Sequence, residues 1–139
     1  MSKQFTLGKN ERLKSRKQIE KLFAEGKSFV VNLFRVYFVV NGEWSIVNSN
    51  SSLQFGVGVG SKSFKRAVDR NRIKRLTREA WRLQNIGLKE KTKTSGKQLS
   101  VFFIYTGKEL PDFKIVKHKV AVALKKLETK LNENHSSNT

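Results

Sequence analysis

The sequence contains no cysteine and only one proline in 139 residues. Without cysteine the chain forms no disulfide framework and no zinc ribbon, and it has no thiol for nucleophilic catalysis. No stretch approaches the roughly 18 consecutive apolar residues of a membrane span. The start, Met-Ser-Lys-Gln-Phe, lacks the apolar core of a secretory signal. We therefore expect one cytoplasmic domain over residues 1–131 and a disordered polar tail over 132–139.

Acidic residues are also scarce, since 11 Asp and Glu stand against 29 Lys and Arg, for a formal net charge of +18. Such an excess repels itself unless a polyanion takes it up. A nucleic acid fits best, because counterion release makes its binding strong and salt-dependent. The alternatives are a membrane surface, which the absence of an opposing Trp- and Leu-rich stripe disfavours, and a basic surface that is merely solvated. Composition does not separate RNA from DNA.

The scarcity of acids limits the catalytic chemistry as well. A metal-dependent nuclease needs several convergent carboxylates, and the acids of this chain are scattered, with no Asp-x-Asp or Glu-x-x-His cluster. The two histidines are His118, in a lysine-rich segment, and His135, in the tail. We therefore predict no catalytic residue and no metal site on this chain. A ribonuclease site of the His/His/Lys type is the remaining alternative.

Hydrophobic patterning predicts a mixture of helices and strands. Apolar residues at helical spacing, preceded by a capping box at Ser15, predict a helix over 16–25. Alternation of apolar side chains predicts one strand over 29–40. The dipeptide Asn-Gly at 41–42 is typical of a two-residue hairpin turn, so a partner strand is expected over 43–47.

Glycine recurs on one face of the segment Phe-Gly-Val-Gly-Val-Gly at 55–60. A phosphate-binding loop requires Gly directly before its Lys, and Ser61 occupies that position, so we interpret the segment as a strand whose glycines admit a close neighbour. A Lys-, Thr- and Gly-rich loop is expected over 87–97, followed by an apolar central strand over 98–106. The dipeptide Pro-Asp at 111–112 would open the last helix.

Residues 62–82 are the most informative segment, with nine basic residues and only two acids, Asp69 and Glu79. On a helix, an apolar stripe would dock on a sheet and a cationic stripe would face outward. Charged faces that are merely solvated usually interleave acids at i,i+4, which this one hardly does. We therefore predict a helix that binds a polyanion. Its apolar stripe is predicted to consist of Val68, Ile73, Leu76, Ala80 and Leu83.

The run Arg-Asn-Arg-x-Lys-Arg-Leu-x-Arg-Glu-Ala at 70–80 resembles the signature helix of the bacterial ribonuclease P protein family. Upstream matches at 12–14 (Arg-Leu-Lys) and 26–28 (Gly-Lys-Ser) extend the resemblance over nearly the whole chain, up to about residue 131. The resemblance implies an α+β two-layer sandwich with a central, mostly antiparallel four-stranded sheet. It also implies a left-handed βαβ crossover, where base rates favour a right-handed one.

In this family a large catalytic RNA removes the 5′ leader from precursor tRNA with Mg²⁺. The resemblance therefore implies the protein subunit of an endoribonuclease whose catalytic centre and Mg²⁺ belong mainly to the RNA. The implied partners are ribonuclease P RNA and precursor tRNA, with no membrane and no obligatory protein partner. The residues carried over as RNA-binding are Lys62, Arg66, Arg70, Asn71, Arg72, Lys74, Arg75, Arg78 and Arg82.

The resemblance also implies that Ile19, Phe23 and Tyr37 line a cleft for the leader, where aromatic rings stack on unpaired bases. Plain core packing is the alternative for Phe23 and Tyr37. Arg72 projects nearer the apolar stripe than its neighbours, so an alternative for Arg72 is that it holds the helix to local backbone. Residues 41–54 are longer than the connection in many family members, and an isoleucine stands at Ile19 where an aromatic residue is common.

Two other functions remain as alternatives to a ribonuclease P subunit. A ribosomal protein or RNA chaperone would also be basic and of this size, but it would be indifferent to the leader of a precursor tRNA. A protein-only nuclease would cut RNA without an RNA partner.

Overall fold

The structure is a computed structural model in which residues 13, 16–41 and 53–136 are described. The chain alternates between helices and strands, and the helix predicted over 16–25 is confirmed. The elements are α1 (Arg16–Glu25), β1 (Lys27–Val31), β2 (Phe34–Asn41), β3 (Leu53–Val59), α2 (Ala67–Gln84), α3 (Ile86–Ser95), β4 (Gln98–Tyr105) and α4 (Phe113–Ser136).

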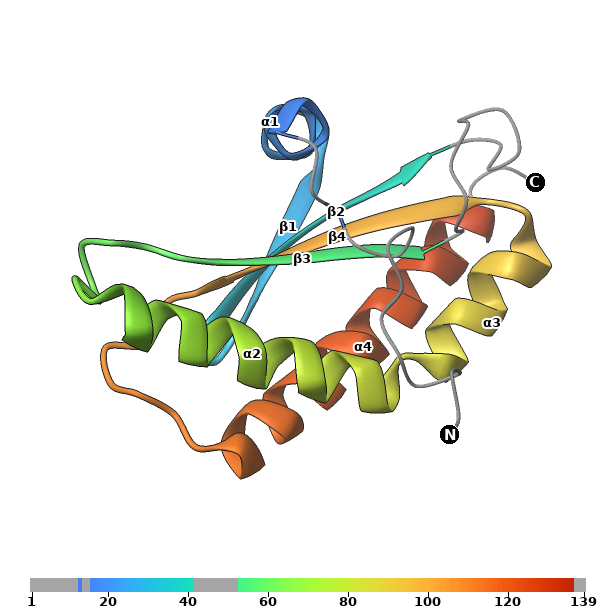
Figure 1. The fold of residues 1–139 in the computed structure, drawn as a ribbon. Coiled ribbons are helices and arrows are strands. Elements are labelled where there is room, and N and C mark those ends of the chain that lie inside the picture. The colour runs from blue at the N-terminus through green and yellow to red at the C-terminus, as the bar shows by residue number, and fades with distance from the viewer. Residues whose placement is uncertain (1–12, 14–15, 42–52, 137–139) are drawn as a thin grey trace, which may run out of the picture.

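The strands form one four-stranded sheet in the order β1-β2-β4-β3. β1 and β4 each pair antiparallel with β2, and β3 pairs parallel with β4. Helices α2, α3 and α4 cover one face of the sheet, and α1 lies across the opposite face (Figure 1). β4 is therefore covered on both sides, which explains its nearly continuous apolar sequence. The predicted α+β fold with a mostly antiparallel sheet is confirmed.

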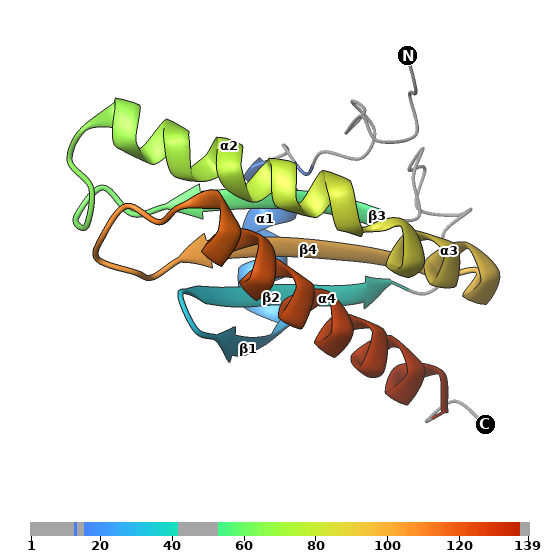
Figure 2. The same ribbon diagram turned by 90° about the horizontal axis from the view of Figure 1, so that it is seen from below.

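The connection from β3 through α2 and α3 to β4 is left-handed. In Figure 2 both strands run toward the left of the view, the helices lie in front of the sheet, and β4 lies below β3. With the strands turned to point upward, the chain moves from right to left as it passes in front of the sheet. The unusual handedness that the family resemblance implies is therefore present.

The main core lies between the sheet and α2 with α4. The ring of Trp81 in α2 stacks on Phe55 in β3, with centroids 4.3 Å apart and planes at 12°, and both side chains are buried. Phe103 meets both rings edge-on. In α4 the buried stripe consists of Val116, Val120, Ala123, Leu124, Leu127 and Leu131.

The apolar stripe predicted for α2 is partly wrong, because Val68 and Leu83 are exposed, at 59% and 38%. The helix is rotated so that Thr77 and Trp81 are buried together with Ile73 and Ala80. Thr77 tolerates burial because its hydroxyl donates to the carbonyl of Ile73 one turn earlier, at 2.8 Å. A hydrophobicity pattern that counts threonine as polar misses this face.

The single strand predicted over 29–40 is also wrong, since the chain reverses at residues 32–33 and forms the hairpin of β1 and β2. Leu33 has a φ of 79°, a left-handed conformation that leucine rarely adopts. The turn therefore lacks the glycine that normally marks such a position in a sequence. The capping box at Ser15 and the partner strand predicted over 43–47 lie outside the described residues.

The loop predicted over 87–97 is wrong as well, because residues 86–95 form α3. Leu88 and Thr92 are its buried residues, too few to produce a visible apolar stripe. Gly96, at φ 72°, ends the helix, and its N–H donates to the carbonyls of Thr92 and Lys93. Gly96 is a typical helix-ending residue, but the sequence before it has no apolar pattern that predicts a helix.

The last helix begins as predicted, with an Asp112 carboxylate oxygen accepting from the N–H of Ile115 at 2.9 Å. It continues to Ser136, so the tail predicted as disordered over 132–139 is helical as far as that residue. No glycine or proline follows Pro111, and a helix anchored by buried Leu131 can extend beyond its packed part.

We predict that Gly56→Ala lowers the free energy of unfolding by about 1–3 kcal/mol, because a Cβ at this position would lie 2.7 Å from Cδ1 of Phe102. The matched control is Gly60→Ala, since a Cβ there meets no atom within 4 Å. The control is expected to be neutral or to stabilise the fold by up to about 1 kcal/mol. Urea denaturation followed by circular dichroism measures both, and equal effects would contradict the packing role of Gly56.

Candidate RNA-binding site

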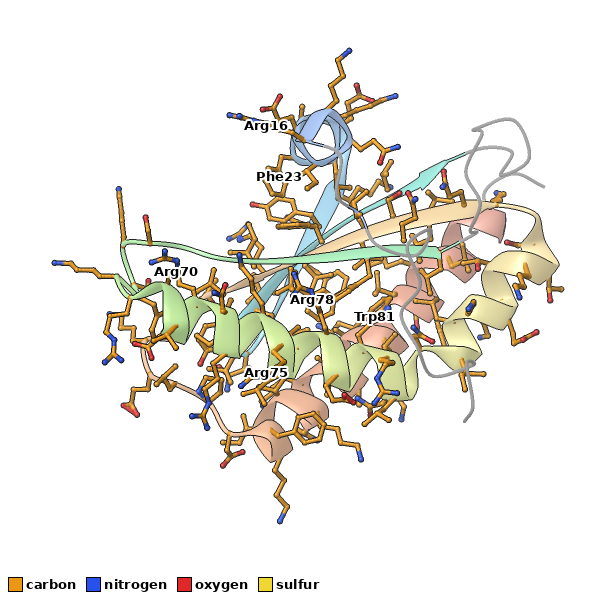
Figure 3. The ribbon with its side chains drawn as sticks, viewed as in Figure 1. Arg16, Phe23, Arg70, Arg75, Arg78 and Trp81 are labelled. Atoms are coloured by element: carbon orange, nitrogen blue, oxygen red, sulfur yellow. The ribbon has the colours of Figure 1, made fainter. Side chains whose placement is uncertain are left out.

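The cationic residues of α2 surround its buried side, some of them exposed and some half-buried. Arg70, Lys74 and Arg78 follow one another at i+4 along the flank next to Trp81, which is the flank facing β3. Figure 3 shows the side chains of Arg70 and Arg78 on this flank and that of Arg75 on the far side of the helix. The exposed members of the predicted set are Lys62, Arg66, Asn71, Arg72, Arg75 and Arg78.

The guanidinium group of Arg70 is bound to backbone. Its Nη1 donates to the carbonyls of Phe64 and Lys65, both at 2.7 Å. These two hydrogen bonds fasten the segment after β3 to the first turn of α2. The alternative role considered for Arg72, holding the helix to local backbone, is therefore filled by Arg70, and Arg72 is exposed.

The two acids of the segment lie beside arginines at the ends of α2. The Oδ2 of Asp69 lies 3.8 Å from the Nε of Arg66. The carboxylate of Glu79 forms an ion pair with Arg82 and accepts a hydrogen bond from it. These pairs offset charge at the ends of the helix rather than at its centre, where Lys74 and Arg75 lie. The positive potential is therefore concentrated on the middle turns of α2.

The predicted leader residues form an aromatic cluster on the opposite face of the sheet. The ring of Phe23 lies 4.8 Å from that of Tyr37 and 5.4 Å from that of Phe102, measured between centroids. Ile19 packs against the same cluster and is half-buried. Phe23 is 41% exposed, so part of its ring surface is open to solvent. Figure 3 shows Phe23 between α1 and the sheet, on the side away from α2.

Phe102 is a member of this cluster that sequence reasoning missed. Its ring lies over the glycine face of β3, where a Cβ at Gly58 would come within 3.1 Å of it. The close neighbour predicted for these glycines is therefore an aromatic ring from β4. A signal was present, because Gly56 is directly opposite Phe102 in the parallel pairing of β3 and β4, but that register follows only from the sheet order.

The described residues offer little for metal binding or proton transfer. Within them, no three His, Asp or Glu side chains gather closely enough to hold a metal ion. Burial raises the pKa of the Tyr105 hydroxyl, and the nearby carboxylate of Glu109 raises it further. The hydroxyl donates to the backbone carbonyl of Glu109, so its role is structural. In the same part of the chain, no helix is long and apolar enough to cross a bilayer.

Comparison with known proteins identifies the family of the chain. Residues 7–128 match the sequence model of the family described as Ribonuclease P. The chain belongs to this ribonuclease P family. Its function is thereby that of a protein component in tRNA processing, within an endoribonuclease whose catalytic RNA is a separate subunit.

Relatives and solved structures agree with this family membership. The chain is 38% identical over 120 residues to the ribonuclease P protein component of Porphyromonas gingivalis strain W83, covering 86% of this chain and 85% of the relative. It is 31% identical to that of Chlorobium phaeobacteroides, covering 84% of each. The RNase P protein from Thermotoga maritima has a similar structure, with a TM-score of 0.62, 30% identity and coverage of 84% of this chain and 96% of that one.

We predict that Arg70→Ala lowers the free energy of unfolding by about 1–2 kcal/mol, because two backbone carbonyls lose a charged hydrogen-bond donor. The control Arg75→Ala removes the same charge from the outer side of the helix and should change stability by less than about 0.5 kcal/mol. Thermal and urea unfolding distinguish the two variants. Equal stability of both variants would mean that Arg70 does not fasten the turn.

Proposed function

We propose that the outer face of α2 binds the catalytic RNA of ribonuclease P, and that the cluster of Phe23, Tyr37 and Phe102 contacts the 5′ leader of precursor tRNA. The observation that carries the proposal is the separation of the two surfaces. The cationic residues lie on a helix on one face of the sheet, and the aromatic cluster lies on the other face. One domain can therefore contact two RNA partners at once.

The case for RNA at α2 rests on charge and exposure. Asn71, Arg72, Arg75 and Arg78 are exposed and Lys74 is half-buried, all on a rigid helix whose inner side is fixed by Trp81. Guanidinium groups match phosphate geometry and donate in pairs, which suits a structured RNA backbone. Arg70 contributes mainly by orienting the helix start, as its two backbone hydrogen bonds indicate.

The case for the leader at the aromatic cluster rests on chemistry that is indifferent to sequence. Every base has a π-face, so an exposed ring accepts the unpaired bases of many different leaders. Phe23 offers such a ring, and Tyr37 adds a phenol beside it. Ile19 contributes apolar surface without an aromatic face, so we expect fewer stacked bases here than in family members with an aromatic residue at this position.

The Mg²⁺ that the family's reaction uses is assigned to the RNA in this proposal. The described acids are dispersed or paired with arginine or lysine, so they do not fit a direct Mg²⁺ site on the protein. The protein would assist by ordering RNA phosphates near the scissile bond. A cytoplasmic location is part of the same proposal, because both proposed partners are RNAs.

The decisive experiment measures cleavage of a 5′-labelled precursor tRNA at near-physiological Mg²⁺ and salt with protein alone, bacterial ribonuclease P RNA alone, and both together. We expect efficient cleavage at the mature 5′ end only in the mixture. The variant Lys74→Ala/Arg75→Ala/Arg78→Ala should weaken RNA binding at least about tenfold and reduce the salt slope by roughly 0.7–0.9 for each lost phosphate contact. The matched control Lys93→Ala/Lys125→Ala/Lys130→Ala removes the same charge elsewhere and should retain most of the effect.

Three outcomes would contradict the proposal. Cleavage by the protein alone would establish a protein-only nuclease. Binding to RNA without any effect on the cleavage rate would establish a chaperone or ribosomal type of function. If both triple variants lose the effect equally, the net charge of the protein and not the α2 face is responsible.

We further predict that Phe23→Ala weakens binding of precursor tRNA to the holoenzyme by about 1 kcal/mol or more, because a stacking surface is lost. Binding of mature tRNA, which has no leader, should not change, and this pair of substrates is the control. Fluorescence binding titrations of both RNAs provide the comparison. An equal loss for both substrates would assign Phe23 to packing alone.

A further inference from the structure

An open groove lies between the turn that joins β1 to β2 and the first turns of α4, away from both surfaces described above. Its volume is about 680 Å³. This flank of α4 faces β1, as the Nζ of Lys126, 5.6 Å from the ring centroid of Phe29, indicates. β1 and β3 are the two opposite edges of the sheet, so the groove is on the far side from the β3 flank of α2. The groove is lined by Asn32, Leu33, Lys114, Ile115, His118 and Lys119.

The floor of the groove is apolar and its shape is fixed in advance. Ile115 is 45% exposed, and Leu33 lies opposite it. Leu33 holds a φ of 79°, and its carbonyl accepts from the N–H of Thr106 at 2.7 Å, which ties the turn to the end of β4. A non-glycine residue persists in such a conformation only where its surroundings hold it, and such positions cluster at binding sites.

The rim of the groove is cationic. Lys114, His118 and Lys119 come from consecutive turns of α4. Between residues 112 and 131 the acids are Asp112 and Glu128. Asp112 accepts from the N–H of Ile115 as the helix cap, and Glu128 pairs with Lys91 of α3 at 3.2 Å. The positive end of the α4 dipole adds to the charge of the rim.

We infer that this groove is a further binding site for single-stranded RNA. Lys114 and Lys119 bind the phosphates of the RNA. A base packs against the apolar side chains of Leu33 and Ile115 and the imidazole of His118. Cations beside an exposed imidazole and an apolar floor combine the two contacts that unpaired RNA makes, with phosphates and with base faces. An acidic peptide would form ion pairs with the lysines, but it has no base to stack on the imidazole of His118. The groove therefore goes beyond the proposed function, because it shares no residue with α2 or with the aromatic cluster.

The test is an NMR titration of the full-length ¹⁵N-labelled protein with an oligouridylate of about a dozen nucleotides. The amide signals of Leu33 and Ile115 report on the groove, because both residues line it and neither belongs to α2 or to the aromatic cluster. We expect these signals to shift saturably. The variant Lys114→Glu/Lys119→Glu should weaken the affinity measured at these signals about tenfold, while the charge-matched control Lys125→Glu/Lys130→Glu should weaken it far less. His118→Ala, which leaves the lysines in place, should weaken it several-fold.

Other results would overturn the inference. Absence of shifts at Leu33 and Ile115, or equal weakening by the two double variants, would mean that the groove is only part of a solvated basic surface. Shifts at these signals with a polyglutamate peptide but not with RNA would assign an acidic protein segment. A concentration-dependent sedimentation coefficient that the groove variant abolishes would assign a second copy of the chain. The cleavage assay with the α2 variant tests the proposed function and does not depend on the groove. Failure of the proposed function and failure of this inference are therefore distinguished.

Discussion

The stacking of Trp81 on Phe55 is the contact on which the arrangement of the molecule depends. It joins α2 to the edge strand β3 with nearly parallel rings, and Phe103 of the neighbouring strand meets both edge-on. Because Trp81 is fully buried, it fixes the rotation of α2 about its own axis. A rotation by one residue, about 100°, would bury a cation and expose the indole. The outward direction of the basic residues is therefore a consequence of this packing.

The central strand β4 links the two faces of the sheet. Phe103 faces α2 and belongs to the main core, while its neighbour Phe102 faces α1 and lies beside Phe23. Gly56 and Gly58 of β3 leave the space that the ring of Phe102 fills. The same strand thus supports a cationic surface on one side and an aromatic surface on the other. This explains how one small domain carries two chemically different surfaces on opposite faces of its sheet.

Much of the fold could be predicted from local patterns, and the errors share a cause. The predictions for α1, β4 and the start of α4 needed only periodicity, an apolar run and a capping residue. The turn at residues 32–33 was missed because a positive φ at Leu33 is held by a contact with Thr106, which is remote in sequence. α3 was missed because Leu88 is its only buried aliphatic residue. The buried side of α2 was misjudged because Thr77 satisfies its hydroxyl within the helix.

The family, the net charge and the supply of basic and aromatic side chains follow from the amino-acid sequence alone. These are local properties, carried by residue identity and spacing, and folding does not alter them. Three features arise only in the folded chain: Arg70 binds backbone while Arg72 is exposed, Phe102 lies beside Phe23, and α4 and the β1–β2 turn line an open cationic groove. Each of these depends on groups that are distant in the chain and become neighbours only when the sheet order and the crossover are set.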